Sequence, residues 1–194
     1  MGLPLELLWA IVGLLLTISG TFLEAFVASP TWLWEQQDIH LHSLGVTFQI
    51  GAVLFVGCMG GKNAAAISQI AYLILGLTIL PIFSEGGGLR YFQEPTFGYL
   101  LGFIPGGWIC GLLAFRSPPK LEFLSLSCCT GLLAIHACGI AYLFSGYAVT
   151  EIFGQTTSFA EAFYYYSLRP LPGQIGVVCA VTVLSYGMRR ILFY

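Results

Sequence analysis

Six long stretches of the chain contain no Asp, Glu, Lys or Arg, and they constrain its fold more than any other feature. They are residues 7–23, 39–61, 63–84, 95–115, 123–150 and 170–188. A helix needs about 20 apolar residues to cross the roughly 30 Å hydrocarbon core of a bilayer. Strands of a membrane barrel would alternate apolar and polar residues over about ten positions, and these stretches do not. The sequence therefore predicts an all-α membrane protein, a bundle of six transmembrane helices.

The charged residues are too few for a soluble domain beside this bundle. They make up 8% of the 194 residues, whereas soluble globular domains contain about 25%. We therefore expect a single integral membrane domain over residues 1–194, which crosses the lipid bilayer several times. Its spans are predicted at about 4–28, 44–61, 63–83, 96–115, 123–146 and 171–190.

The distribution of basic residues predicts the orientation in the membrane. Lys and Arg concentrate in cytoplasmic loops. If the N-terminus is cytoplasmic, the inner segments contain five of the seven basic residues, namely Lys62, Arg116, Lys120, Arg189 and Arg190. The outer loops then contain only Arg90 and Arg169. We expect both termini in the cytoplasm, the chain in the cell membrane, and the long loops 29–43, 84–95 and 147–171 outside, where recognition would occur.

Small residues recur every four positions in the first span, at Gly13, Thr17, Thr21 and Ala25. This spacing places them on one helical face, where another helix can approach closely. The face either packs within the bundle or docks another membrane subunit.

A glycine series raises the same question in the segment from Glu94 to Gly111, "EPTFGYLLGFIPGGWICG". Gly98, Gly102 and Gly106 are spaced by four residues, and Gly107 and Gly111 form a second pair. Such a series clears a groove that either a second helix or a ligand could fill.

The outer loops and span ends contain several polar candidates. Three glycines at 86–88 allow a tight turn or a close approach of backbone to a ligand. Arg90 could bind an anionic ligand or pair with a neighbouring carboxylate. Thr96 and Pro95 begin a helix, and the free N–H groups there attract polar atoms. Within the spans, His136 either faces a polar cavity or bonds a neighbouring helix, and Gln174 offers two donors and an acceptor.

The first outer loop also permits a metal interpretation, because it contains Glu35, Asp38, His40 and His42. Carboxylates and imidazoles bind zinc, but this spacing matches no established motif. A solvated loop explains the same residues, and we expect no metal site.

No nucleotide-binding loop is found. Val56, the residue just before "GCMGGKN", occupies the first glycine position of such a loop, and Asn63 follows the lysine where Ser or Thr is required. We expect no cofactor, no ATP hydrolysis by this chain, and no nucleic-acid partner.

Four segments in order resemble one family. They are "VTFQ", which ends at Gln49, "AYLILGLTILPIF" at 71–83, "EPTFGYLLGF" at 94–103 and "PLPGQ" at 170–174. Together they resemble the BioY family, the biotin-specific substrate-binding (S) components of energy-coupling-factor (ECF) transporters. Glu94 and Phe97 stand where the family usually has glycine, and Gln174 and Val177 where it usually has aspartate and lysine.

The resemblance implies a six-helix protein that captures biotin from outside. It would then dock on a transmembrane coupling subunit driven by two ATPase subunits, and would not be an enzyme. By the same resemblance, Gln174, Thr96 and Tyr99 would make polar contacts with biotin, Arg90 would bind its carboxylate, and Gly86, Gly87 and Gly88 would approach it closely. Gln49 and His136 complete the predicted binding set. The first-span face at 13–25 would contact the coupling subunit.

Three alternatives stay open at this stage. The ligand could be another vitamin or a biotin precursor, as the residues at 174 and 177 allow. The chain could instead be an intramembrane metal-dependent enzyme that uses the acidic and histidine residues at 35–42. It could also be a structural subunit without a ligand, whose glycine groove only packs helices.

Overall fold

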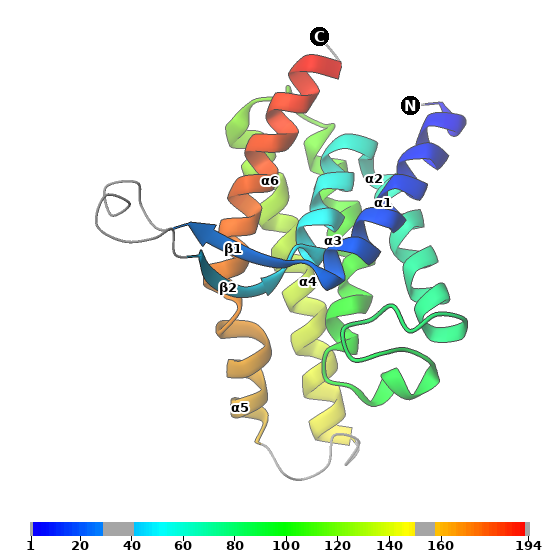
Figure 1. Ribbon diagram of the computed structural model, residues 1–194, viewed down its shortest axis with the longest axis vertical. Coiled ribbons are helices and arrows are strands. Elements are labelled where there is room, and N and C mark those ends of the chain that lie inside the picture. The colour runs from blue at the N-terminus through cyan, green and yellow to red at the C-terminus, as the bar shows by residue number, and fades with distance from the viewer. Residues whose placement is uncertain (1, 29–40, 150–157, 193–194) are drawn as a thin grey trace.

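Figure 1 shows a computed structural model of the protein, which describes residues 2–28, 41–149 and 158–192. Its longer elements are α1 (Leu3–Phe22), β1 (Glu24–Ala28), β2 (Leu41–Thr47), α2 (Gln49–Thr78), α3 (Phe97–Ala114), α4 (Leu121–Val149) and α6 (Leu171–Leu192). Three short helices are η2 (Leu89–Gln93), α5 (Phe159–Phe163) and η3 (Tyr164–Leu168), the last of which is a π-helix.

Five helices of the described chain are long and apolar enough to cross a membrane. They are α1, α2, α3, α4 and the run from α5 through α6. This agrees with the predicted helical membrane bundle. The count is one fewer than the six predicted spans because α2, with 30 residues, covers two of them.

The chain of α2 reverses direction at Gly61. This residue has φ 79° and ψ −179°, a conformation outside the helical region. Gln49 Nε2 donates a hydrogen bond of 2.8 Å to the Tyr72 hydroxyl. In a straight helix the 23 residues between them would span about 34 Å. The element is therefore two antiparallel arms, 49–60 and 62–78, which lie side by side in Figure 1.

The glycine series of α3 packs helices together. A Cβ on Gly102 would lie 2.8 Å from the Ile135 carbonyl oxygen of α4, and one on Gly98 would lie 2.2 Å from Tyr142 Cβ. On the other face of α3, a Cβ on Gly111 would lie 2.5 Å from the backbone nitrogen of Lys62. Contact with neighbouring helices therefore accounts for this series of glycines.

A strand pair occupies the end of the first predicted span and the start of the second. β1 and β2 are antiparallel, with Glu24 opposite Thr47 and Ala28 opposite Leu41. The helices are therefore shorter than the predicted spans 4–28 and 44–61 at these ends, since α1 ends at Phe22 and α2 begins at Gln49. Apolar residues such as Phe26 favour a strand as readily as a membrane helix, so hydropathy alone did not separate them. The third predicted span, 63–83, also ends earlier, at Thr78.

The small residues of the first span lie inside the bundle. Thr17 is fully buried, and its Oγ1 accepts a hydrogen bond of 3.0 Å from Gln69 Nε2 in the second arm of α2. A Cβ on Gly13 would lie 2.9 Å from Ser68 Cβ. Thr21 and Ala25 are buried as well, the latter in β1. Packing within the chain thus uses this face, and its docking of another subunit stays a prediction.

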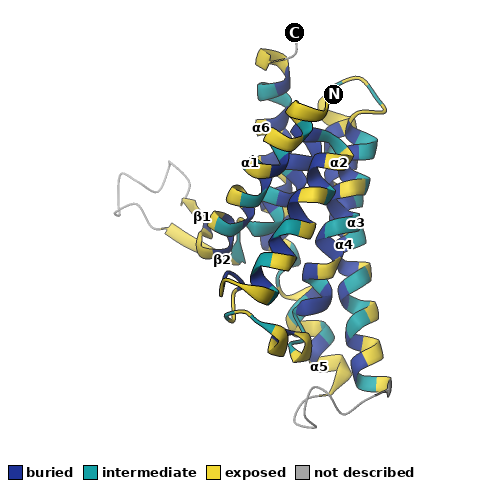
Figure 2. Cartoon of the chain, turned by 90° about the vertical axis from the view of Figure 1, so that its right-hand side faces the viewer, coloured by how far each residue is buried: buried dark blue, intermediate teal, exposed yellow. Residues whose placement is uncertain are grey.

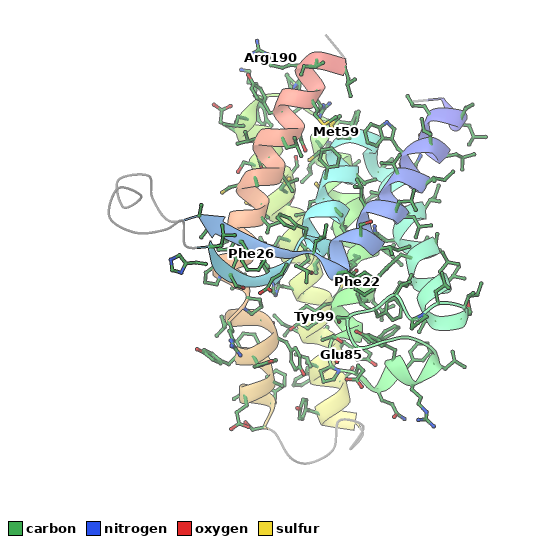
Figure 3. The ribbon with its side chains drawn as sticks, in the orientation of Figure 1. Phe22, Phe26, Met59, Glu85, Tyr99 and Arg190 are labelled. Atoms are coloured by element: carbon green, nitrogen blue, oxygen red, sulfur yellow. The ribbon has the colours of Figure 1, made fainter. Side chains whose placement is uncertain are left out.

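The two ends of the bundle differ in charge and in construction. The start of α1, the turn at Gly61 and the end of α6 lie at one end, where Figure 3 shows Arg190. The 79–96 loop and α5 lie at the other end, where Figure 3 shows Glu85. Figure 2 shows buried residues along the middle of the bundle and exposed ones around its outside.

Candidate functional site

The candidate site is centred on a buried polar pair between α4 and α6. The Gln174 Oε1 atom accepts a hydrogen bond of 2.7 Å from His136 Nε2. Both residues are 7% exposed. The bond uses one polar atom of each side chain, so the Gln174 amide N–H groups and the His136 Nδ1 atom are the groups that could bind a ligand.

Tyr99 of α3 joins this pair to the π-helix η3. Its ring meets the His136 ring edge-on, with centroids 5.6 Å apart and planes at 82°. Its hydroxyl lies 2.5 Å from Ser167 Oγ. A Cβ on Gly139 would lie 2.4 Å from the Tyr99 ring, so α4 has room for the ring only because residue 139 is glycine. Figure 3 shows Tyr99 in the lower half of the bundle, between the strand pair and the loop with Glu85.

A second polar network surrounds Tyr72, which is fully buried. Its hydroxyl donates to the Ile82 carbonyl oxygen at 3.0 Å, accepts from Gln49 Nε2 at 2.8 Å and lies 3.2 Å from Thr21 Oγ1. These bonds connect α1, both arms of α2 and the loop that follows. The predicted ligand residue Gln49 therefore has a partner within the protein.

Hydroxyl groups and aromatic rings close the same end of the bundle. Thr96 Oγ1 donates a bond of 3.2 Å to the Tyr91 hydroxyl, which also lies 3.2 Å from Ser84 Oγ. The Tyr91 ring is 4.6 Å from the Phe83 ring. Thr96, which was predicted with Pro95 to begin a helix, thus bonds Tyr91 of η2, the short helix just before α3.

The three consecutive glycines fold onto the end of α2. Gly88 N–H donates a hydrogen bond of 2.8 Å to the Gly76 carbonyl oxygen, and a Cβ on Gly87 would lie 2.7 Å from that same atom. Gly86 and Gly88 have φ values of 110° and 85°, which favour glycine. Arg90 follows on η2 and is exposed. Approach of these residues to a ligand stays a prediction.

A polar pocket of about 370 Å³ lies between β2 and the end of η3. Its lining consists of Ser43, Leu44, Gly45, Tyr165, Arg169 and Pro170. The Arg169 guanidinium carbon lies 5.2 Å from the centre of the Tyr165 ring. Arg169 is therefore a second cation close to the site. From the sequence alone, this residue served only to predict the orientation in the membrane.

Of the proposed metal ligands, only His42 lies in the described part of the chain. It is exposed on β2, opposite Val27 of β1. Glu35, Asp38 and His40 lie outside the described residues.

The comparison with known proteins decides the family. The model of the BioY family matches residues 6–193. The chain belongs to the BioY family. The resemblance of its sequence segments to that family is thereby confirmed.

Relatives with a curated description agree with this membership. A probable biotin transporter BioY of Lysinibacillus sphaericus is 41% identical over 123 residues, which cover 62% of each chain, less than two thirds of that relative. The biotin transporter BioY of Thermotoga maritima is 31% identical over 127 residues, 65% of this chain and 72% of that one. An uncharacterised 21.2 kDa protein of Cyanophora paradoxa is 27% identical over 186 residues, 96% of this chain and 95% of that one.

A solved structure shares the fold of this BioY member. It is the crystal structure of the S-component for biotin from an ECF-type ABC transporter, with a TM-score of 0.69 and 17% identity. The match covers 95% of this chain and 90% of that chain. The helical membrane bundle is therefore the S-component fold.

Two of the four departures from the usual BioY residues, Gln174 and Val177, lie in the buried part of α6. Gln174 bonds His136, as described above. Val177 is 3% exposed, and a Cβ on Gly51 of α2 would lie 2.7 Å from its Cγ1 atom. The position where BioY proteins usually have lysine thus packs tightly against α2, and α6 contributes a neutral polar group to the site in place of a charged pair.

Proposed function

We propose that this chain is the substrate-binding subunit of an ECF transporter and captures biotin from the outer side of the cell membrane. Membership in the BioY family over residues 6–193 carries the proposal. The two relatives described as biotin transporters and the S-component fold support it. In this role the chain acts in transport rather than catalysis, and a transmembrane coupling subunit with two ATPase subunits drives uptake.

The proposed topology has six spans with both termini in the cytoplasm. It counts the two arms of α2 as separate spans, in keeping with the reversal at Gly61. The end of the bundle that contains this turn would face the cytoplasm, in keeping with the positions of Lys62 and Arg190. The end with the 79–96 loop and α5 would face outward.

The chemistry of biotin suits the residues at the outer half of the bundle. Its ureido group has hydrogen-bond donors and an acceptor, which the Gln174 amide and the His136 ring could match. Its ring and valeryl chain are apolar, and aromatic side chains such as Tyr99 would cover them. Its carboxylate would pair with Arg90 at the exposed rim, where an arginine can bind it through two hydrogen bonds.

The experiment measures binding of labelled biotin to the purified protein in detergent. Gln174→Ala should weaken binding by about 5- to 150-fold, because loss of a buried hydrogen bond costs about 1–3 kcal/mol. Arg90→Ala should weaken it less, because Arg90 is exposed. Arg190→Ala, at the opposite end of the bundle, is the matched control for loss of a positive charge.

Unchanged affinity for biotin in both Gln174→Ala and Arg90→Ala would refute the proposed binding pocket. Arg169→Ala, tested beside Arg90→Ala, shows which of the two outer arginines binds the carboxylate. Because Gln174 and Val177 differ from the usual family residues, a biotin precursor such as dethiobiotin is the second candidate ligand. Tighter competition by dethiobiotin than by biotin would favour it.

A further inference from the structure

Three buried cysteines from different helices meet in the core. Cys58 lies in the first arm of α2, Cys110 in α3 and Cys128 in α4, and each is 0% exposed. The Cys58 sulfur is 3.7 Å from that of Cys110 and 3.5 Å from that of Cys128. All three sulfur atoms lie within 4.8 Å of one another. The remaining cysteines, Cys129, Cys138 and Cys179, are less buried and lie outside this group.

The fourth side of the cysteine cluster is formed by polar residues of α6. The Ser185 hydroxyl is 0% exposed and interacts with the Cys58 thiol, and it makes no geometrically regular hydrogen bond among the described residues. Thr182, also buried, lies next to Cys128. A buried hydroxyl whose hydrogen bonding is poorly satisfied costs free energy, so its position beside the Cys58 thiol calls for an explanation.

We propose that Cys58, Cys110, Cys128 and Ser185 bind one thiophilic divalent cation, of which Zn²⁺ is the biological example. A Zn–S bond measures about 2.3 Å, so two thiolates in a tetrahedral site lie about 3.8 Å apart. The separations of 3.7 and 3.5 Å come close to this value. Three cysteine ligands leave one tetrahedral position, which Ser185 Oγ, the hydroxyl next to Cys58, would fill.

The charges of such a site balance in the membrane interior. Binding requires the three thiols to become thiolates, so three protons leave for solvent as one M²⁺ enters. The resulting M(Cys)₃ group has a net charge of −1. Arg189 is 7% exposed, within electrostatic range of Cys58, and supplies +1. A neutral assembly avoids the large cost of an uncompensated charge in a low-dielectric core.

The cluster lies close to one end of the bundle, where ions could enter. Cys110 is four residues from the end of α3, or about 6 Å along the helix. A pocket of about 340 Å³ at this end is lined by residues next to the cluster in sequence, including Gly60 and Gly111, and by Glu6. Met59, the neighbour of Cys58, marks this upper part of the bundle in Figure 3. A bound cation would fasten α2, α3 and α4 together here.

The test uses Cd²⁺ as a probe with the full-length purified protein under reducing conditions. Binding is followed by the ultraviolet charge-transfer absorption of Cd–thiolate bonds and by metal analysis after gel filtration. A variant that keeps only the cluster, Cys129→Ser/Cys138→Ser/Cys179→Ser, should bind one Cd²⁺ per chain. The complementary variant, Cys58→Ala/Cys110→Ala/Cys128→Ala, should bind none. Since the cation binds only the folded chain, Cd²⁺ should raise the melting temperature of the first variant alone.

Packing of three small thiols without a metal is the competing explanation. If the cluster-only variant binds no Cd²⁺, or binds it without the charge-transfer band, this competing explanation holds and the metal site is refuted. Equal Cd²⁺ binding by the two variants would also overturn it. Ser185→Ala should keep the charge-transfer band but weaken Cd²⁺ binding several-fold. The control Ser145→Ala, at a serine of a different helix, α4, should leave Cd²⁺ binding unchanged. Biotin binding takes no part in these measurements, so they succeed or fail separately from the proposed function.

Discussion

Replacement of Gly102 by alanine tests the close packing of α3 against α4. The new methyl group would lie 2.8 Å from the Ile135 carbonyl oxygen and 2.9 Å from its Cα, where ordinary contacts begin at 3.4 Å. These are backbone atoms, so no side-chain rotation relieves the overlap, and the helices must separate by about 0.6 Å locally. Overpacking of this kind costs about 1–3 kcal/mol. For a chain of this size, 2 kcal/mol lowers the melting temperature by about 4–8 °C.

The measurement is thermal unfolding of the detergent-purified protein, followed by the loss of helical circular dichroism. Gly187→Ala in α6 is the control, because nothing lies within 4 Å of a Cβ there. It should leave the melting temperature unchanged or raise it slightly, since alanine is favoured over glycine in a helix by about 0.5–1 kcal/mol. Equal melting temperatures for Gly102→Ala and the unchanged protein would refute the inferred backbone contact of α3 with α4.

Three further predictions concern the turn at Gly61, the Tyr99–Ser167 bond of the candidate site and the capping box at the start of α5. Gly61→Ala should lower stability by about 1–3 kcal/mol, because φ 79° with ψ −179° is accessible essentially only to glycine; chemical unfolding measures this, and no loss would contradict the reversal. Tyr99→Phe removes the bond to Ser167 and should cost about 1 kcal/mol and speed biotin release, seen by stopped flow; an unchanged release rate would argue against the bond. Ser158→Ala removes the capping box with Glu161 and should destabilise α5 by about 1 kcal/mol, measured as faster proteolysis there; equal cleavage rates would contradict it.

The helices were predictable because a bilayer imposes one requirement on every span. Charge-free stretches of sufficient length fix α3, predicted at 96–115 and observed at Phe97–Ala114, almost to the residue. The outer ends of the first two spans were not predictable in this way. Residues such as Phe26 and Leu41 are apolar in a strand as in a helix, and the pairing of β1 with β2 depends on residues 13 or more positions apart.

Three of the predicted binding residues come together in the structure, and their role in binding a ligand stays a prediction. Tyr99, His136 and Gln174 were selected from the sequence, and the structure places them together. Their contacts depend on how α3, α4 and α6 pack, since His136 and Gln174 are 38 residues apart. Ser167 carried no signal, because a serine in an outer loop is common. The cysteine cluster was missed for the same reason, because three cysteines in three spans look like unrelated packing residues.

The construction of the bundle determines which part can open for a ligand. α3 is fixed on both faces by contacts of its backbone, through Gly102 toward α4 and Gly111 toward α2, so its separation from either would expose well-packed core. The cap of α5 and η3 is different, since it is short and is held by side chains, through the Tyr99–Ser167 bond to α3 and the Phe144–Phe159 ring contact of 6.1 Å to α4. Entry of biotin by movement of the cap therefore costs much less than parting of the helices. Hydrogen exchange should then be faster at 158–168 than at 97–114, and biotin binding should slow it at 158–168. Slow exchange at 158–168 without ligand would instead place the opening in the 79–96 loop.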